Sequence, residues 1–256
     1  MTDTRRTNTK PTDTRWTDTK GDNPSSSTVW VVIPAAGVGK RMQADRPKQY
    51  LPLCNKTVIE QTLSCFAEHQ SIAGIVISLH PNDPYWDALD IDLPIAHFVV
   101  KGGKQRSDSV LNALRMMQNE LQVNANSWVM VHDAARPCLL KSDLDKLITA
   151  CFSCNTVGAI LAKKASDTMK RATPDQTIAT TEDRENLWHA LTPQMFRLKQ
   201  LSDALQFALE QGVAITDDAS ALEYSGELPL LIEASGSNIK ITHPDDLALA
   251  EFLLKK

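Results

Sequence analysis

Short apolar runs and segments with helical spacing alternate along most of the chain. The apolar runs are rich in β-branched residues and lie at 29–33, 74–79, 96–100, 128–132, 157–162 and 228–233. Runs of this kind predict strands that are buried on both faces, as in a parallel sheet. Alternating helices then cover the two faces of that sheet. The pattern therefore predicts an α/β fold with a Rossmann-like, mostly parallel sheet and helices on both faces.

The helical segments carry recognisable end signals. A Thr or Ser before the helix, with an acidic residue three positions later, forms a capping box, and a glycine after the last turn ends a helix. We expect signals of this type to bound four helices. The signals are Thr57 with Glu60, Ser142, Gly212 after a leucine-rich segment that starts at 198, and Thr242 with Asp245.

Two segments depart from this pattern. Residues 1–27 repeat Thr-Asp-Thr-Arg or Thr-Asp-Thr-Lys units with almost no aliphatic side chains, so we expect a disordered N-terminal tail. Residues from about 163 to 184 contain few core-sized side chains and a turn signal at 173–176, which predicts a projecting β-hairpin arm. Since a two-stranded arm is marginal alone, we expect it to pack against a second copy of the chain in a homodimer.

The composition narrows the classes of function. The chain has 256 residues, of which 42% are apolar, and a net charge of -4. A mild acidic excess disfavours a nucleic-acid binder, and no apolar stretch is long enough for a membrane span. The five cysteines are an odd number and the first residues lack the apolar core of a secretory signal, which favours the cytoplasm. The six histidines show no zinc-binding spacing, so none is predicted to bind a metal.

A loop of small and basic residues follows the first predicted strand. The sequence Pro-Ala-Ala-Gly at 34–37 is followed by Gly39, Arg41 and, beyond a proline, Lys48. The loop has neither the spacing of a P-loop nor the third glycine of a dinucleotide loop. Small residues let backbone N–H groups approach a ligand, and two cations suit a polyphosphate at the end of a strand. The alternative is a plain turn whose cations are solvated.

Six further motifs follow this loop in a recognisable order. They are GGKQRSDSV at 102–110, VHDAARP at 131–137, DTMKR at 167–171, DRENLWHALTPQ at 183–194, TDDASALE at 216–223 and NIKIT at 238–242. Together with PAAGVGKRM and the PKQYL that follows it, they closely resemble the 2-C-methyl-D-erythritol 4-phosphate cytidylyltransferases of the non-mevalonate isoprenoid pathway. The resemblance covers about residues 29–254, within a nucleotidyltransferase domain predicted at 28–256.

The resemblance implies transfer of CMP from CTP to 2-C-methyl-D-erythritol 4-phosphate, giving 4-diphosphocytidyl-2-C-methyl-D-erythritol and pyrophosphate. A phosphate oxygen of the acceptor would attack the α-phosphorus in line, so catalysis would consist of positioning and electrostatic stabilisation. Mg²⁺ on the phosphates is the expected cofactor. An alternative in the same class is transfer to another polyol phosphate, such as ribitol 5-phosphate. Two other classes are a nicotinamide-dependent oxidoreductase and a nucleotide-binding homologue without activity.

The resemblance also implies roles for particular residues. Those expected to be catalytic are Arg41, Lys48, Arg184 and Lys240. Those expected to contact CTP are Pro34, Ala35, Ala36, Gly37, Gly39, Lys48, Gly103, Lys104, Arg106 and Ser109. Those expected to contact the polyol phosphate are Asp133, Arg136, Thr168, Arg184, Thr192 and Lys240. Because two of the last group lie on the predicted arm, the arm is expected to complete the site of the other subunit.

Local structure is predicted around three of these residues. Ser107 or Ser109 is expected to cap the helix that follows the glycines. Lys240 is expected at the end of a short strand, 238–241. No protein residue is assigned as a metal ligand. Asp133 is the carboxylate best placed to offer one, and contact with the sugar alcohol is its alternative role.

Overall fold

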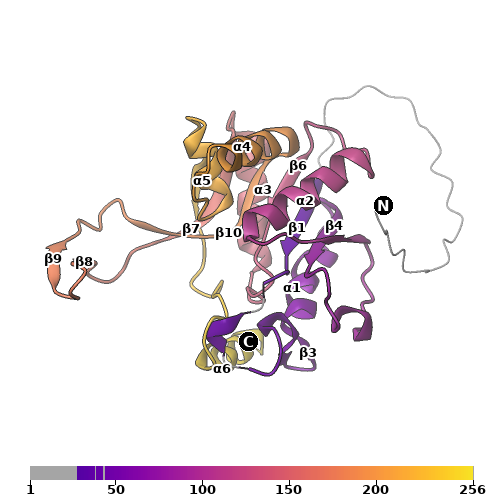
Figure 1. The fold of residues 1–256 in the computed structure, drawn as a ribbon, viewed down its shortest axis with the longest axis horizontal. Coiled ribbons are helices and arrows are strands. Elements are labelled where there is room, and N and C mark those ends of the chain that lie inside the picture. Colours follow the sequence, from indigo (N-terminus) through magenta and orange to yellow (C-terminus); the bar gives the residue numbers. More distant parts are fainter. Residues whose placement is uncertain (1–27, 38, 43, 256) are drawn as a thin grey trace, which may run out of the picture.

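The computed structural model describes residues 28–37, 39–42 and 44–255, so the predicted tail at 1–27 lies outside the described residues. A seven-stranded sheet runs through the middle of the fold (Figure 1). In spatial order its strands are β11 (Leu230–Glu233), β7 (Gly158–Lys164), β10 (Trp188–Arg197), β6 (Trp128–Val131), β1 (Val29–Pro34), β4 (Ile72–Leu79) and β5 (Ala96–Lys101). All the predicted strands of the sheet are confirmed, with ends displaced by one or two residues.

The strand order shows where a ligand is expected to bind. β10 is antiparallel to β6 and β7, whereas the other neighbouring strands are parallel. The chain passes from β1 to β4 and β5 on one side and then returns to β6 on the other side of β1. Ligands of such sheets bind at the carboxyl ends of the strands where the order reverses, here β1 and β6. The apolar pattern does not predict β10, because Pro193 stands within it and proline counts against a central strand.

Helices cover both faces of the sheet, as predicted. They are α1 (Val58–Ala67), α2 (Arg106–Asn119), α3 (Lys141–Ser153), α4 (Leu198–Glu210), α5 (Asp218–Tyr224) and α6 (Asp245–Leu254). α1 and α3 share one apolar core with Val31 and Ile33, while α2, α4 and α5 share the other with Val32. Successive residues of β1 thus enter opposite cores, which fixes the orientation of the loop that follows. In the ranges described, no helix combines the length and apolarity needed to cross a bilayer.

A smaller apolar cluster supports the edge of the sheet at which ligands are expected to bind. The cluster includes Met42 of η1 (Lys40–Met42), Leu53 of β2 (Pro52–Leu53) and Ala250 of α6. Further short elements are η2 (Lys48–Tyr50), β3 (Lys56–Thr57) and η3 (Trp86–Ala88), and Tyr50 and Trp86 pack in the core shared with α1 and α3. Ile241 is fully buried in this cluster, where α6 covers it, and its N–H donates to the backbone oxygen of Ala135 at 2.9 Å. Residues 238–241 are irregular rather than a strand, so that prediction is wrong. The hydrogen bond nevertheless holds Lys240 next to the end of β6.

A hairpin arm projects between β7 and β10 (Figure 1). Its strands, β8 (Lys170–Ala172) and β9 (Ile178–Thr181), are antiparallel and are joined by the predicted turn. All residues of the two strands are exposed, including Ile178 at 68%. The predicted hairpin is therefore confirmed, except that Lys163 and Lys164 belong to β7.

Two of the predicted helix ends are confirmed. Thr57 Oγ1 accepts the N–H of Glu60 while the Glu60 carboxylate accepts the N–H of Thr57, which is the predicted capping box of α1. Gly212 follows α4 with a φ of +67°, a conformation that glycine adopts without strain.

Two other predicted helix caps are wrong. α3 begins at Lys141, so Ser142 lies in its first turn rather than before it. α6 begins at Asp245, and the N–H of Thr242 is bound by Asp246 instead of forming a capping box with Asp245. In both cases the N-cap lies two residues from the predicted one, at Leu140 and at Pro244, a displacement that local sequence does not resolve.

Candidate active site

A cleft of about 280 Å³ opens at the carboxyl ends of β1 and β6. It is formed by the loop after β1, the start of η2, the glycine loop before α2 and the turn after β6, with Lys240 beside them. The predicted site residues that line it are Pro34, Ala35, Ala36, Gly37, Gly39, Arg41, Lys48, Gly103, Lys104, Arg106, Ser109, Asp133 and Lys240. The structure thus brings together every residue expected to contact CTP.

The lining of the cleft is strongly positive. Its charged side chains, within the described residues, are those of Arg41, Lys48, Lys104, Arg106 and Lys240, and one carboxylate, Asp133. Cations gathered in a concave surface of low dielectric attract and retain polyanions. The charge therefore suits a ligand with several phosphates.

Asp133 is the centre of an ion-pair network. Its Oδ1 accepts a hydrogen bond from Nε of Arg106 at 3.0 Å, and its Oδ2 lies 2.8 Å from Nζ of Lys240 and 3.4 Å from Nε of Arg136. Burial alone would raise the pKa of Asp133, but these three cations outweigh it and hold the pKa well below its ordinary value. Arg106 also pairs at 2.8 Å with Asp218, a fully buried carboxylate on α5. Asp133 therefore stays charged and orients the cations at the cleft.

Lys48 is half-buried beside this network. Its Nζ donates a hydrogen bond to the backbone oxygen of Ile241 at 2.7 Å. Burial, followed by the charge of Lys240, lowers the pKa of Lys48 to about 8. The ammonium is thus still charged at neutral pH but is poorly compensated by the protein, so an arriving polyanion would stabilise it.

The glycine loop lies directly against the loop after β1. A Cβ at Gly102 would stand 2.5 Å from Cβ of Ala36 and 2.9 Å from Oγ of Ser109, so a side chain does not fit there. The N–H of Gly103 donates to Oγ of Ser109 at 3.0 Å. The two loops therefore form a narrow wall that presents backbone atoms to the cleft.

The predicted capping role of Ser107 or Ser109 is wrong. Gln105 is the N-cap of α2, and both serines lie within the first turn of the helix. The Ser109 hydroxyl instead donates to the backbone oxygen of Gln105 at 3.1 Å while it accepts the N–H of Gly103. It thereby holds the glycine loop to the helix.

Arg136 and Thr192 lie behind the cleft, where they hold the turn after β6. Thr192 Oγ1 accepts the N–H of Asp133 at 3.1 Å and lies 3.1 Å from Nδ1 of His132. Nε2 of His132 lies 3.0 Å from the backbone oxygen of Arg136. Burial lowers the pKa of His132 to about 4, so the neutral ring donates through Nε2 and accepts the Thr192 hydroxyl at Nδ1. These contacts fix the position of Asp133.

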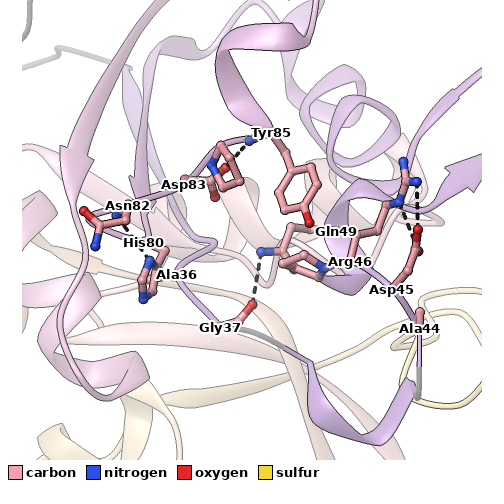
Figure 2. A pocket seen from close by; sticks show the side chains of 12 residues that line it. Ala36, Gly37, Ala44, Asp45, Arg46, Gln49, His80, Asn82, Asp83 and Tyr85 are labelled. Carbon is pink, nitrogen blue, oxygen red and sulfur yellow. Dashed lines mark hydrogen bonds and ion pairs between the residues drawn. The ribbon is translucent and has the colours of Figure 1, made fainter.

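A second cavity of about 310 Å³ adjoins the cleft (Figure 2). It shares Ala36, Gly37 and Gln49 with the cleft. Among its described lining residues Arg46 is the only lysine or arginine, and this guanidinium is bound at 2.9 Å by Asp45. The cleft, with its larger positive charge, is therefore the stronger candidate for a polyphosphate.

Comparison with known proteins identifies the family. The sequence profile of the IspD family, 2-C-methyl-D-erythritol 4-phosphate cytidylyltransferase, matches residues 29–256. The chain belongs to this family. The cytidylyltransferase of Vibrio vulnificus (strain CMCP6) is 53% identical over 232 residues, which are 91% of this chain and 97% of that protein.

Two further relatives agree with this assignment. The cytidylyltransferase of Pseudomonas entomophila (strain L48) is 48% identical over 218 residues, which are 85% of this chain and 92% of that protein. A crystal structure of the cytidylyltransferase from Francisella tularensis matches with a TM-score of 0.75 at 36% identity, over 88% of this chain and 99% of that chain. The likeness to a solved structure confirms the predicted fold class.

Membership of the cytidylyltransferase family confirms the predicted reaction. The family takes its name from transfer of a cytidylyl group to 2-C-methyl-D-erythritol 4-phosphate, a reaction of the nucleotidyltransferase type. The named relatives do not favour the alternative acceptor, ribitol 5-phosphate, nor a nicotinamide-dependent oxidoreductase.

Two predicted site residues of this chain lie away from the cleft. Thr168 and Arg184 are exposed residues of the arm. Nη1 of Arg184 donates to the backbone oxygen of Ser166, at the base of the arm. Figure 1 shows the arm extending away from the sheet. The single chain therefore does not bring these two residues to the cleft.

Sequence reasoning missed three buried polar residues of the cytidylyltransferase. They are Gln49, His132 and Asp218. Each lies inside one of the motifs, beside a residue that is either apolar or already predicted to belong to the site. A polar residue buried in such a place needs hydrogen-bond partners. That requirement is the signal that points to a role near the site.

Proposed function

We propose that the cytidylyl transfer takes place in the cleft between β1 and β6, where Arg41 and Lys48 hold the triphosphate of CTP. The gathering of cations at this edge of the sheet is the observation that carries the proposal. Negative charge builds up on the α-phosphate and the departing pyrophosphate during the reaction, and cations already in place stabilise it. The backbone N–H groups of the loop from Pro34 to Gly39 would add further donors.

The cytosine ring would lie between the loop after β1 and the glycine loop. The close contact between Gly102 and Ala36 leaves a narrow, backbone-lined wall, against which Gly103 and Ser109 would meet the edge of the base. Lys104 would lie on the open side, near the ribose and phosphates. Arg106 is bound by two carboxylates, so its main role would be to orient Asp133.

The acceptor would enter beside Asp133 and Lys240. Its phosphate is ionised near neutral pH, so an oxygen can attack the α-phosphorus without a general base. One oxygen–phosphorus bond forms to the acceptor, and the bond from the α-phosphorus to the bridging oxygen of pyrophosphate breaks. Lys240, already held by Asp133 at 2.8 Å, would neutralise charge between the two substrates. Arg136 and Thr192 would act through the turn that carries Asp133.

Magnesium fits this arrangement. No group of three or more His, Cys, Asp or Glu side chains placed to hold a metal occurs among the described residues. Mg²⁺ usually needs only one or two carboxylates together with substrate phosphates. Asp133, the carboxylate of the cleft, would hold it with phosphate oxygens of CTP. When bound, the ion would neutralise charge on those oxygens.

We further propose that the arm completes the cleft of a second copy of the chain. Both arm strands are exposed, and a hairpin of this size is marginal by itself. A homodimer would cover Ile178 and would bring Thr168 and Arg184 to the acceptor side of the partner's cleft. The odd number of cysteines supports the cytoplasm as the location.

The test measures pyrophosphate release from CTP with 2-C-methyl-D-erythritol 4-phosphate. Lys48→Ala should lower kcat/KM by about a hundredfold or more, as loss of one preorganised charge does. Lys56→Ala, at an exposed lysine of β3, is the matched control and should behave as the wild type. Near-normal turnover by Lys48→Ala would refute the assigned role. Comparable turnover of ribitol 5-phosphate would refute the choice of acceptor.

A further inference from the structure

Gln49 is a buried amide at the boundary between the cleft and the second cavity. It is 4% exposed and follows Lys48 on η2. Its Nε2 donates to the backbone oxygen of Ala35 at 2.7 Å. The same Nε2 donates to the backbone oxygen of Gly37 at 3.1 Å (Figure 2). A primary amide carries two N–H hydrogens, so one side chain satisfies both carbonyls.

We propose that Gln49 is a positioning residue for CTP, which clamps the loop after β1 in the shape that binds the triphosphate. The proposal rests on the proposed placement of CTP in the cleft. The C=O and N–H of a trans peptide point in opposite directions. Because Gln49 binds the carbonyl of Ala35, the N–H of Ala36 in the same peptide unit points away from it. Within the described chain that N–H has no hydrogen-bond acceptor, so it is available to a ligand.

The clamp also sets the spacing between this loop and Lys48. A 3-10 helix has about three residues per turn, so three consecutive side chains point in three directions. Lys48 reaches the cleft, Gln49 reaches the loop, and Tyr50 enters the core, where its hydroxyl donates to Asp83 at 2.8 Å. Tyr50 is 3% exposed and anchors the turn. One rigid turn thus couples the loop amides and the ammonium that would bind the same triphosphate.

Loss of the clamp should act on CTP rather than on the acceptor. Without a donor, the carbonyls of Ala35 and Gly37 would lose a buried partner, and the loop would relax to find another. A carbonyl oxygen that turned toward the triphosphate would repel it. Asp133 and Lys240, on the acceptor side, do not contact Gln49, since their side-chain partners are each other, Arg106 and Arg136.

The test compares Gln49→Met with Gln61→Met. Methionine keeps the length of the side chain but donates no hydrogen bond. Gln61 on α1 is the matched control, because its Nε2 also donates to a backbone oxygen, that of Leu53 at 3.1 Å, away from the cleft. Titration calorimetry gives Kd for CTP with Mg²⁺, and steady-state assays give KM for both substrates. We expect Gln49→Met to raise Kd for CTP about tenfold, because one to two hydrogen bonds are lost. The KM for the acceptor should change less than about twofold.

Wild-type CTP affinity in Gln49→Met would overturn the clamp, as would equal losses for both substrates together with a lower Tm. Should that variant not fold, Gln49→His replaces it, because its single ring N–H can hold only one of the two carbonyls. Weaker CTP binding then supports the clamp of both carbonyls, and wild-type binding overturns it. Lys48→Ala separates this result from the proposed function. Full CTP affinity in Lys48→Ala would mean that CTP binds elsewhere, which contradicts the proposed function. Reduced CTP affinity in Lys48→Ala, together with wild-type CTP affinity in Gln49→Met, would reject the clamp alone.

Discussion

Nζ of Lys240 lies 2.8 Å from Oδ2 of Asp133, although the two residues come from distant parts of the chain. Asp133 follows β6, and Lys240 precedes the fully buried Ile241, whose N–H is bound by Ala135. The pair therefore joins the C-terminal segment to the carboxyl end of the sheet. It keeps a cation in place at the cleft before any ligand arrives, which is the condition for electrostatic catalysis.

Replacement of Asp133 by asparagine should destabilise the fold. Arg106, Arg136 and Lys240 would lose their common partner while they remain close together, and breaking a buried ion pair costs about 3–5 kcal/mol. We expect a decrease of this size in the free energy of unfolding at pH 7, measured with urea. Asp90→Asn, at an exposed carboxylate, should match the wild type.

The same variant should change the response to acid. The folded-state pKa of Asp133 lies below its ordinary value of about 3.9. Its contribution to stability is therefore complete above about pH 5 and is lost as pH falls toward the folded-state pKa. Asp133→Asn should lose less stability between pH 5 and pH 3 than the wild type. Identical stability of both proteins across this range would refute the network.

Affinity for CTP should fall above about pH 8. The pKa of Lys48 in the ligand-free protein is about 8, because of burial and the nearby charge of Lys240. The phosphates of CTP are fully ionised in this range, so loss of the lysine proton sets the slope, up to about tenfold per pH unit. Calorimetric titrations between pH 7 and pH 9.5 measure it. Lys48→Arg stays charged and should give a flat profile. A flat wild-type profile would contradict the assignment.

Thr192→Val should weaken the turn that carries Asp133. The change removes the hydroxyl between His132 Nδ1 and the N–H of Asp133, and each buried group left unpaired costs about 1–3 kcal/mol. Urea unfolding should show this loss, and acceptor KM should rise. Thr192→Ser keeps the hydroxyl and should lie closer to the wild type. Equal stability of both variants would show that the hydroxyl does not stabilise the fold.

Mixing two inactive variants tests the proposed role of the arm. Arg41→Ala damages the cleft, and Arg184→Ala damages the arm. In a mixed dimer one of the two sites would receive both intact residues, so a random mixture should recover about a quarter of wild-type activity. Pyrophosphate release measures the recovery, and mass spectrometry confirms that subunits have exchanged. Exchange without recovery would mean that the arm serves its own chain or no site.

Local sequence predicted the parts of the fold that depend on local properties. The strand predicted at 29–33 is confirmed, because a short apolar run rich in β-branched residues is most stable as a buried strand. The box of Thr57 with Glu60 is confirmed because its partners are three residues apart. The loop after β1 is predictable for the same reason, because it directly follows the end of that strand.

Contacts between residues far apart in the sequence leave no local pattern. Arg106, expected to contact CTP, is held by Asp133 and by Asp218, which is 112 residues away. No local pattern indicates that pairing. β10 escaped prediction because Pro193 interrupts its pattern, while its register with β7 shifts at the same place. The destination of the arm depends on a second chain, which one sequence cannot place.

The most direct test is the position of CTP in a crystal structure of the full chain grown with CTP and Mg²⁺. The account predicts phosphate oxygens within hydrogen-bond distance of Nζ of Lys48 and of the guanidinium of Arg41, with the base against Gly103. CTP seated in the second cavity beside Tyr85, or phosphates that contact neither Lys48 nor Arg41, would contradict it.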